Sequence, residues 1–260
     1  MSTDTDAVSS QVVQRQFETG IIDQVFSLVY ALLAYAVGAG ALFWLFFAAA
    51  DLVPYAVSDF RTGSTAGAVL FDAGLILLFG LQHTIMARPT FKQWWTQLIP
   101  AHLERSTYVL TSGIALGVVL WFWQPLPGSV WSVTDPAARM IVQAITLLGA
   151  AYVLFASFIT NHFELFGLRQ AWLHVRGRPY APLEFRKNWT YRYSRHPIML
   201  GLLVVFWAAP DMTMTRLVFA VMLTVYLFIG IHFEERTLVH YFGDRYREYR
   251  NEIGMFFTLR

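Results

Sequence analysis

Residues 198–231, IMLGLLVVFWAAPDMTMTRLVFAVMLTVYLFIGI, decide the fold of this chain. The stretch is almost wholly apolar and is interrupted only around Pro210 and Asp211. A membrane crossing needs about 20 apolar residues at about 1.5 Å of rise each, so the stretch is too long for one crossing. The interruption therefore predicts a hairpin of two helices, whose first arm, 198–209, covers only about 18 Å.

Further apolar segments precede this hairpin, at 25–50, 66–86, 108–123 and 140–160. Hydrophobic residues make up 56% of the chain and charged residues only 14%, against about 25% charged in soluble domains. We therefore predict an all-α, polytopic membrane helix bundle of five to six hydrophobic segments, the last two forming the hairpin. Six crossings, and four crossings plus a re-entrant hairpin, both remain open.

The polar N-terminus and the absence of cysteine set further limits. Residues 1–24 are polar and lack the pattern of a signal peptide, so we expect them not to be cleaved off. They precede a single membrane domain formed by residues 25–260. The chain has no cysteine, which excludes disulfides, thiolate metal sites and a cysteine nucleophile. A net charge of +2 is too small to indicate nucleic-acid binding.

Basic residues predict the orientation, because Lys and Arg concentrate in cytoplasmic connections. Three connections carry three, seven and five of them, respectively: 87–107, 161–197 and 232–260. The alternate connections carry one each: 51–65, 124–139 and 210–216. We expect the first set and both termini to face the cytoplasm.

A positive cluster meets a helix start at 195–201, RHPIMLG. A residue before proline avoids the helical conformation and proline favours the first helical position, so a helix should begin at Pro197. The free N–H groups of its first turn suit an anion, and Arg195 adds a bidentate donor for a carboxylate or phosphate. Gly201 leaves room for close approach of a ligand or another helix. An ordinary helix start with arginines reaching the interface is the structural alternative.

Two further polar groups lie at ends of apolar segments. Glu234 and Glu235 directly follow one, and adjacent carboxylates there are costly unless paired. Asn161 and His162 follow another, and polar groups at membrane depth usually face a protein interior or a wet cavity. His83 lies at the same expected depth, where a purely structural histidine is the alternative.

These groups predict a ligand with a carboxylate for Arg195 and the helix start, and with hydroxyls or a cation for the glutamates. S-adenosylmethionine fits this description. A nucleotide or a zwitterionic headgroup would fit as well.

The spacing of these motifs resembles a known family. RHPxxxG at 195–201, followed by EExxLxxxFGxxYxxY at 234–249, resembles the signature of the isoprenylcysteine carboxyl methyltransferase-like membrane enzymes, which use S-adenosylmethionine at the cytoplasmic face. NHFELFGLRQ (161–170), YRYSRHPIMLG (191–201) and FWAAPDMT (206–213) more narrowly resemble the bacterial methanethiol S-methyltransferases, which make dimethyl sulfide. The wider family often has Tyr where this chain has Met199, which weakens any transfer of the prenylcysteine activity and is compatible with the thiol-methylating branch.

The resemblance implies roles for specific residues, with the C-terminal part at about 161–257 binding the cofactor. Arg195 would stabilise a thiolate, and the proton would go to one of His162, Tyr191 and His83. The implied cofactor-binding residues are His196, Pro197, Leu200, Gly201, Glu234, Glu235, Tyr246 and Arg247. The implied substrate-binding residues are Asn161, Phe163, Gln170, Met199 and Trp207. No residue is assigned to a metal.

Other functions remain open at this point. The same fold and cofactor could serve a prenylcysteine carboxylate or a phospholipid amine as acceptor. A haem-binding or transport protein is less favoured, because no span carries a histidine pair at helical spacing and no repeated halves are visible. The sequence does not reveal an oligomeric state.

Overall fold

The computed structural model describes residues 20–181 and 189–258. Most of the expected N-terminal segment, 1–24, thus lies outside the described residues, and the first described helix begins at Ile21. The long helices are α2 (Ile21–Ala49), α3 (Thr65–Met86), α5 (Glu104–Phe122), α6 (Pro136–Thr160) and α10 (Met214–Phe242). A shorter apolar helix, α9 (Pro197–Trp207), precedes α10.

Among the residues that the structure describes, five helical stretches are long and apolar enough to cross a membrane: α2, α3, α5 with the preceding 3-10 turn η1 (Ala101–Leu103), α6 and α10. The predicted polytopic membrane helix bundle is thereby confirmed. α9 has only 11 residues, packs against α10 and is joined to it through a short strand, as expected for the hairpin.

Capping side chains fix where several helices begin. Ser64, Asp135 and Thr213 precede α3, α6 and α10, and each side-chain oxygen accepts a hydrogen bond from a backbone N–H three residues later. Proline occupies the first position of both α6 and α9, where a missing N–H costs nothing. The predicted helix start at Pro197 is therefore confirmed.

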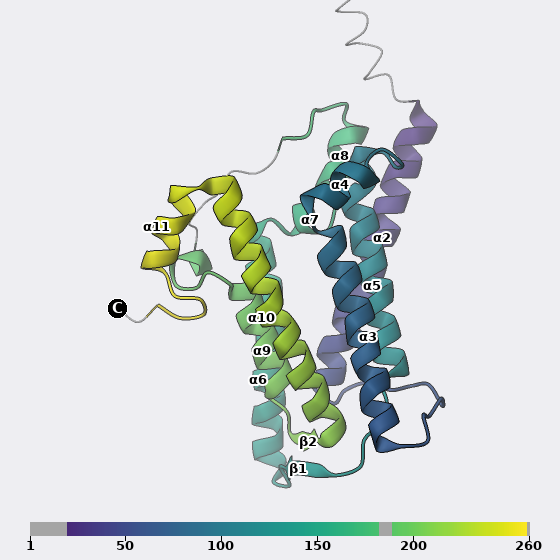
Figure 1. The fold of residues 1–260 in the computed structure, drawn as a ribbon, viewed down its shortest axis with the longest axis vertical. Coiled ribbons are helices and arrows are strands. Elements are labelled where there is room, and N and C mark those ends of the chain that lie inside the picture. The colour runs from purple at the N-terminus through teal and green to yellow at the C-terminus, as the bar shows by residue number, and fades with distance from the viewer. Residues whose placement is uncertain (1–19, 182–188, 259–260) are drawn as a thin grey trace, which may run out of the picture.

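The short elements gather at the two ends of the bundle (Figure 1). One end carries α4 (Pro89–Trp95), α7 (His162–Leu165), α8 (Leu168–Val175), the turn η2 (Trp189–Arg192) and α11 (Asp244–Glu252), and we call it the site end. The other end carries an antiparallel ribbon of β1 (Ser129–Ser132) and β2 (Asp211–Thr213). The sequence did not predict this ribbon, whose strands of four and three residues are too short for a recognisable alternation.

Glycines allow the closest helix contacts. A Cβ on Gly113 of α5 would lie 2.7 Å from the Cα of Gly38 on α2. A Cβ on Gly201 of α9 would lie 2.6 Å from Cγ2 of Val153 and 2.9 Å from the carbonyl oxygen of Gly149, both on α6. Small residues at such crossings let membrane helices approach each other closely.

Two arginines at the ribbon end, Arg139 and Arg216, are paired with acids. Arg216 is 6% exposed and donates to Asp51 at 2.6 Å. Arg139 lies 2.6 Å from Asp211 and 3.8 Å from Asp51. These two arginines are therefore neutralised within the protein, whereas the unbalanced positive charge of the sequence lies at the site end.

Candidate active site

The beginning of α9 is tied to α10 by a buried polar network. Nε of Arg195 donates to Oε1 of Glu235 at 2.8 Å, and Nε2 of His196 lies 3.0 Å from the same oxygen. The side chains of Arg195, His196 and Glu235 are only 10%, 3% and 12% exposed. The carboxylate of Glu234 lies 3.6 Å from Nδ1 of His196 but is 49% exposed. The two adjacent glutamates thus differ: Glu235 is inside the network and Glu234 is at its edge.

The charge of His196 follows from these neighbours. Burial alone would lower its pKa, but the carboxylates of Glu234 and Glu235 together outweigh this effect and raise the pKa above the usual value. The imidazole is thereby favoured in its protonated form, as a partner of two carboxylates.

Arg195 also holds the C-terminal segment against the beginning of α9. Its Nη1 donates to the carbonyl oxygens of Arg250 at 3.0 Å and Ile253 at 2.6 Å. The backbone N–H groups of Arg195 and His196 donate to the carbonyls of Gly254 and Met255, each at 3.1 Å. Arg195 therefore joins α9, α10 and the chain after α11, and much of its donor capacity is used inside the protein.

Aromatic side chains of α11 pack behind this network. Tyr246 and Tyr249 are 1% and 4% exposed and form one cluster with Ile253. The hydroxyl of Tyr249 donates to the carbonyl of Tyr191 at 2.7 Å, which fixes η2 beside Arg195. Arg247 lies on the outer side of α11, where it pairs with Asp244 at 2.6 Å and is 57% exposed. The structure therefore places Tyr246 within the packing and Arg247 at the surface.

The predicted residues of α9 separate into two groups. Pro197 and Gly201 are buried, and the N–H of Leu200 donates to the carbonyl of His196 at 3.0 Å. Met199 is partly buried against the main hydrophobic core. Trp207 lies about 15 Å further along the helix axis and donates to Thr224 at 3.0 Å. Contrary to the expectation, the structure does not bring Trp207 to the Arg195 end of α9.

Asn161 and His162 mark a sharp bend between α6 and α7. Asn161 has a φ of 116°, and its side chain accepts from the N–H of Glu164 at 3.1 Å. Nδ1 of His162 lies 2.8 Å from Oγ of Ser157, and Nε2 lies 3.0 Å from the Tyr35 hydroxyl. Burial lowers the pKa of His162, so its ring is neutral near pH 7.

Tyr191 connects this bend to the Arg195 network. Its hydroxyl lies 2.6 Å from Oγ1 of Thr160, the last residue of α6. Burial raises the pKa of Tyr191, so the hydroxyl remains protonated and acts as a hydrogen-bond donor. His83, by contrast, lies within α3, 2.8 Å from the Tyr108 hydroxyl and 3.1 Å from Oγ of Ser112.

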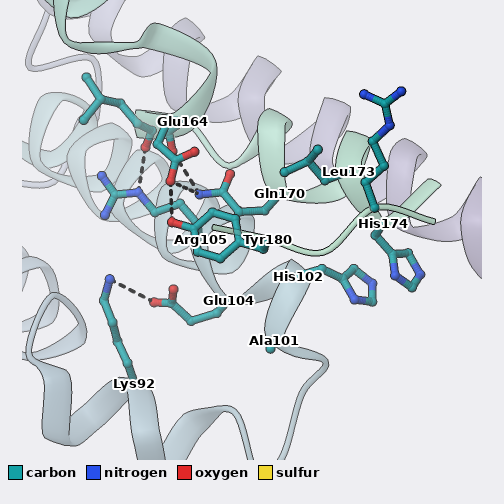
Figure 2. Close-up of a pocket in the computed structure, with 12 residues that line it drawn as sticks. Lys92, Ala101, His102, Glu104, Arg105, Glu164, Gln170, Leu173, His174 and Tyr180 are labelled. Carbon is teal, nitrogen blue, oxygen red and sulfur yellow. Dashed lines mark hydrogen bonds and ion pairs between the residues drawn. The ribbon is translucent and has the colours of Figure 1, made fainter. Parts of the chain in front are cut away.

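A cavity of about 490 Å³ opens at the site end next to α7 and α8 (Figure 2). Gln170 lines it and donates to Glu164 at 3.1 Å, and Tyr180 donates to the same carboxylate at 2.5 Å. Oε1 of Gln170 is buried without a hydrogen-bond partner among the described residues. Phe163 is 52% exposed and does not line the cavity. The remaining lining residues are Lys92, Ala101, His102, Glu104, Arg105, Leu165, Leu173, His174 and Arg178.

Sequence reasoning missed most of this cavity lining. Glu104 and Arg105 begin α5, where they resemble ordinary basic and acidic residues flanking a span. Lys92 forms a salt bridge of 3.7 Å with Glu104, and Nε of Arg105 donates to the carbonyl of Leu165 at 2.7 Å. The cavity residues come from separate elements, so no local spacing reveals them. Arg195 and Glu235 do not line this cavity.

The amino-acid sequence is similar to several curated proteins. It is 45% identical over 204 residues to a protein of Mycobacterium tuberculosis named methanethiol S-methyltransferase, covering 78% of this chain and 84% of that protein. Methanethiol S-methyltransferase 2 of Bradyrhizobium diazoefficiens is 38% identical over 229 residues, or 88% of each chain. Nurim of Bos taurus is 34% identical over 170 residues, covering 61% of this chain and 63% of nurim. No protein-family model and no solved structure matches the chain.

The fold and the site together define a polytopic membrane helix bundle with a buried polar network between the beginning of α9 and α10. Sequence identities of 45% and 38% over most of this chain and of the methanethiol S-methyltransferases show the family. The chain belongs to the methanethiol S-methyltransferase family. This confirms the narrower of the two resemblances in the sequence.

Proposed function

We propose that this chain is an integral membrane, S-adenosylmethionine-dependent methyltransferase that converts methanethiol to dimethyl sulfide. The family membership supports the reaction, and the network of Arg195, His196 and Glu235 at the beginning of α9 carries the proposal for the site. We further propose that the site end faces the cytoplasm of a bacterial inner membrane, because the basic connections gather there.

The residues around α9 fit this cofactor. Pro197 has no N–H and the N–H of Leu200 is bonded within the helix, so the N–H groups of Ile198 and Met199 are those suited to a carboxylate. Glu234 is half-exposed and fits the ribose hydroxyls or the ammonium group. Glu235 is already held by Arg195 and His196, so we assign it to positioning and Glu234 to ligand contact. The cofactor-binding part of the chain is then about 161–257, within one domain.

S-adenosylmethionine supplies a sulfonium methyl group when bound, and the protein has to present a thiolate to it. A free thiol is mainly protonated at neutral pH, with a pKa of about 8.5 for cysteine. His162 is the neutral imidazole beside the end of α6, and we assign it as the proton acceptor. The Tyr191 hydroxyl is protonated and acts as a donor that orients a partner. Positioning of the thiolate in line with the methyl group supplies most of the catalysis.

The reaction is tested by headspace gas chromatography on detergent-purified protein. Dimethyl sulfide should form only when enzyme, S-adenosylmethionine and methanethiol are all present. Glu234→Gln should raise the KM for S-adenosylmethionine at least about 10-fold, in line with losing a hydrogen bond that the ligand donates to a charged acceptor. The matched control is Arg236→Gln, which changes an exposed neighbour on α10 and should leave KM unchanged.

The other outcomes are equally informative. Binding of S-adenosylhomocysteine without dimethyl sulfide formation would refute the thiol acceptor and direct the assay to prenylcysteine carboxylates and phospholipid amines. Absence of S-adenosylhomocysteine binding would refute the cofactor. An equal effect of Glu234→Gln and Arg236→Gln would refute the role of Glu234.

A further inference from the structure

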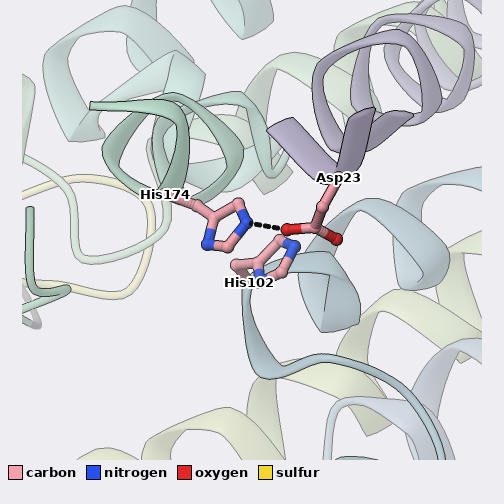
Figure 3. Close-up of side chains that lie close together, drawn as sticks. All are labelled: Asp23, His102 and His174. Carbon is pink, nitrogen blue, oxygen red and sulfur yellow. Dashed lines mark hydrogen bonds and ion pairs between the residues drawn. The ribbon is translucent and has the colours of Figure 1, made fainter. Parts of the chain in front are cut away.

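Two histidines and an aspartate from three distant elements meet at the site end (Figure 3). Asp23 lies in the first turn of α2, His102 in η1 and His174 in α8. One ligand atom from each of the three lies within 4.8 Å of the other two. Asp23 and His174 are 151 residues apart in the chain, yet Oδ2 of Asp23 lies 2.7 Å from Nε2 of His174.

The two imidazoles are held face to face. Their ring centroids are 3.5 Å apart and the ring planes differ by only 8°. Nε2 of His102 lies 2.8 Å from the hydroxyl of Ser27, which is fully buried one turn after Asp23 on α2. This contact turns the His102 ring toward the helix that carries the carboxylate. A protein partner that fixes the ring is a regular feature of metal-binding histidines.

Two imidazoles and one carboxylate favour some metal ions over others. Neutral imidazole nitrogens bind Zn²⁺ and similar transition-metal ions, whereas Mg²⁺ and Ca²⁺ prefer oxygen ligands alone. Metal–ligand distances of about 2.0–2.2 Å place neighbouring donor atoms roughly 3.3 Å apart in a tetrahedral site. The donor atoms here lie within 4.8 Å of one another, and the two stacked imidazoles have to turn out of their parallel arrangement for both nitrogens to point at one ion.

Three protein ligands leave at least one coordination position open. His102 and His174 both line the 490 Å³ cavity, so this open position can face its interior. Gln170 also lines this cavity, and its Oε1 is buried without a partner among the described residues.

We propose that Asp23, His102 and His174 bind one divalent transition-metal ion of the Zn²⁺ type, with an open position toward the cavity. The ion joins α2, η1 and α8. The proposal is independent of the methyl-transfer site at Arg195. It adds a metal to a chain whose sequence assigned none, because the ligands share no local spacing.

Metal binding is measured on full-length, detergent-purified protein carrying no histidine tag, with Co²⁺ and Zn²⁺ as the probes. Wild-type protein should bind one ion per chain, show a visible Co²⁺ absorption band that Zn²⁺ removes, and melt at a higher temperature when Zn²⁺ is added. Asp23→Asn and His174→Ala should weaken Zn²⁺ binding by more than the ~10-fold that changes around a metal's ligands usually cost. The matched control is His240→Ala, which removes an exposed histidine of α10 and should bind as the wild type does.

The proposal is overturned if wild-type protein shows no saturable binding, or if all variants bind equally. It is also overturned if His240→Ala loses binding as His174→Ala does. Asp23→Asn preserves side-chain size at a position that is 46% exposed, so it keeps the test valid if His174→Ala fails to fold.

Discussion

Replacing Glu235 by Gln should destabilise the protein, whereas the same change at Glu234 should not. The Glu235 carboxylate accepts from Arg195 at 2.8 Å and from His196 at 3.0 Å, and all three side chains are nearly buried. Hydrogen bonds to charged groups contribute about 1.5–3 kcal/mol each, and a Gln oxygen still accepts one weaker bond. We expect Glu235→Gln to lower the free energy of unfolding by about 2–4 kcal/mol. Glu234 is 49% exposed with one contact at 3.6 Å, so Glu234→Gln should cost less than about 1 kcal/mol.

Unfolding in mixed detergent and SDS micelles, followed by tryptophan fluorescence, measures both variants. A double-mutant cycle with Arg195→Met separates the pair from the rest of the network, because Glu235→Gln should cost much less when its arginine partner is absent. Equal losses for the two glutamates would refute the distinction between them. An additive cycle would show that Arg195 and Glu235 are not energetically coupled.

Three other changes test the packing and the charges. Gly201→Leu should lower the free energy of unfolding by about 1–3 kcal/mol through overpacking, while Gly117→Leu, which has open space, should not, as measured by the same unfolding assay. The pKa of His196 is raised in the folded protein, so its protonation stabilises the fold fully below about pH 6.5, the pKa of an unfolded histidine, and less as the pH rises above that. The difference in melting temperature between wild type and His196→Asn should therefore shrink as the pH rises. Asp51→Asn should cost about 3 kcal/mol by leaving the buried Arg216 without its anion, and thermal melts that match the wild type would contradict this.

Much of the fold follows from local sequence. The apolar runs located four segments and the terminal hairpin, whose second arm became the long helix α10, because the length of an apolar run sets how much helix a bilayer accepts. Pro197 marked a helix start, since its ring fixes the backbone conformation of the first helical position. Helix α10 nevertheless continues to Phe242, past the end of its apolar run at Ile231, so the hydropathy pattern underestimated it.

Only part of the candidate site could be predicted from the sequence. Motif spacing brought Arg195, His196 and Glu235 together correctly, because the two helices that carry them are consecutive and antiparallel. Spacing did not show that Glu235 rather than Glu234 enters the network, since adjacent residues on a helix differ by about 100° and packing decides which one is buried.

The sequence by itself determined the class of protein, the end at which basic residues gather and the family. Each of these depends on the composition or order of neighbouring residues. Only the tertiary structure decided that Gly201 faces α6, that a polar cavity lies beside α7 and α8, and that Asp23, His102 and His174 meet. Those contacts join residues far apart in the chain, and they arise from how the helices pack rather than from any local preference.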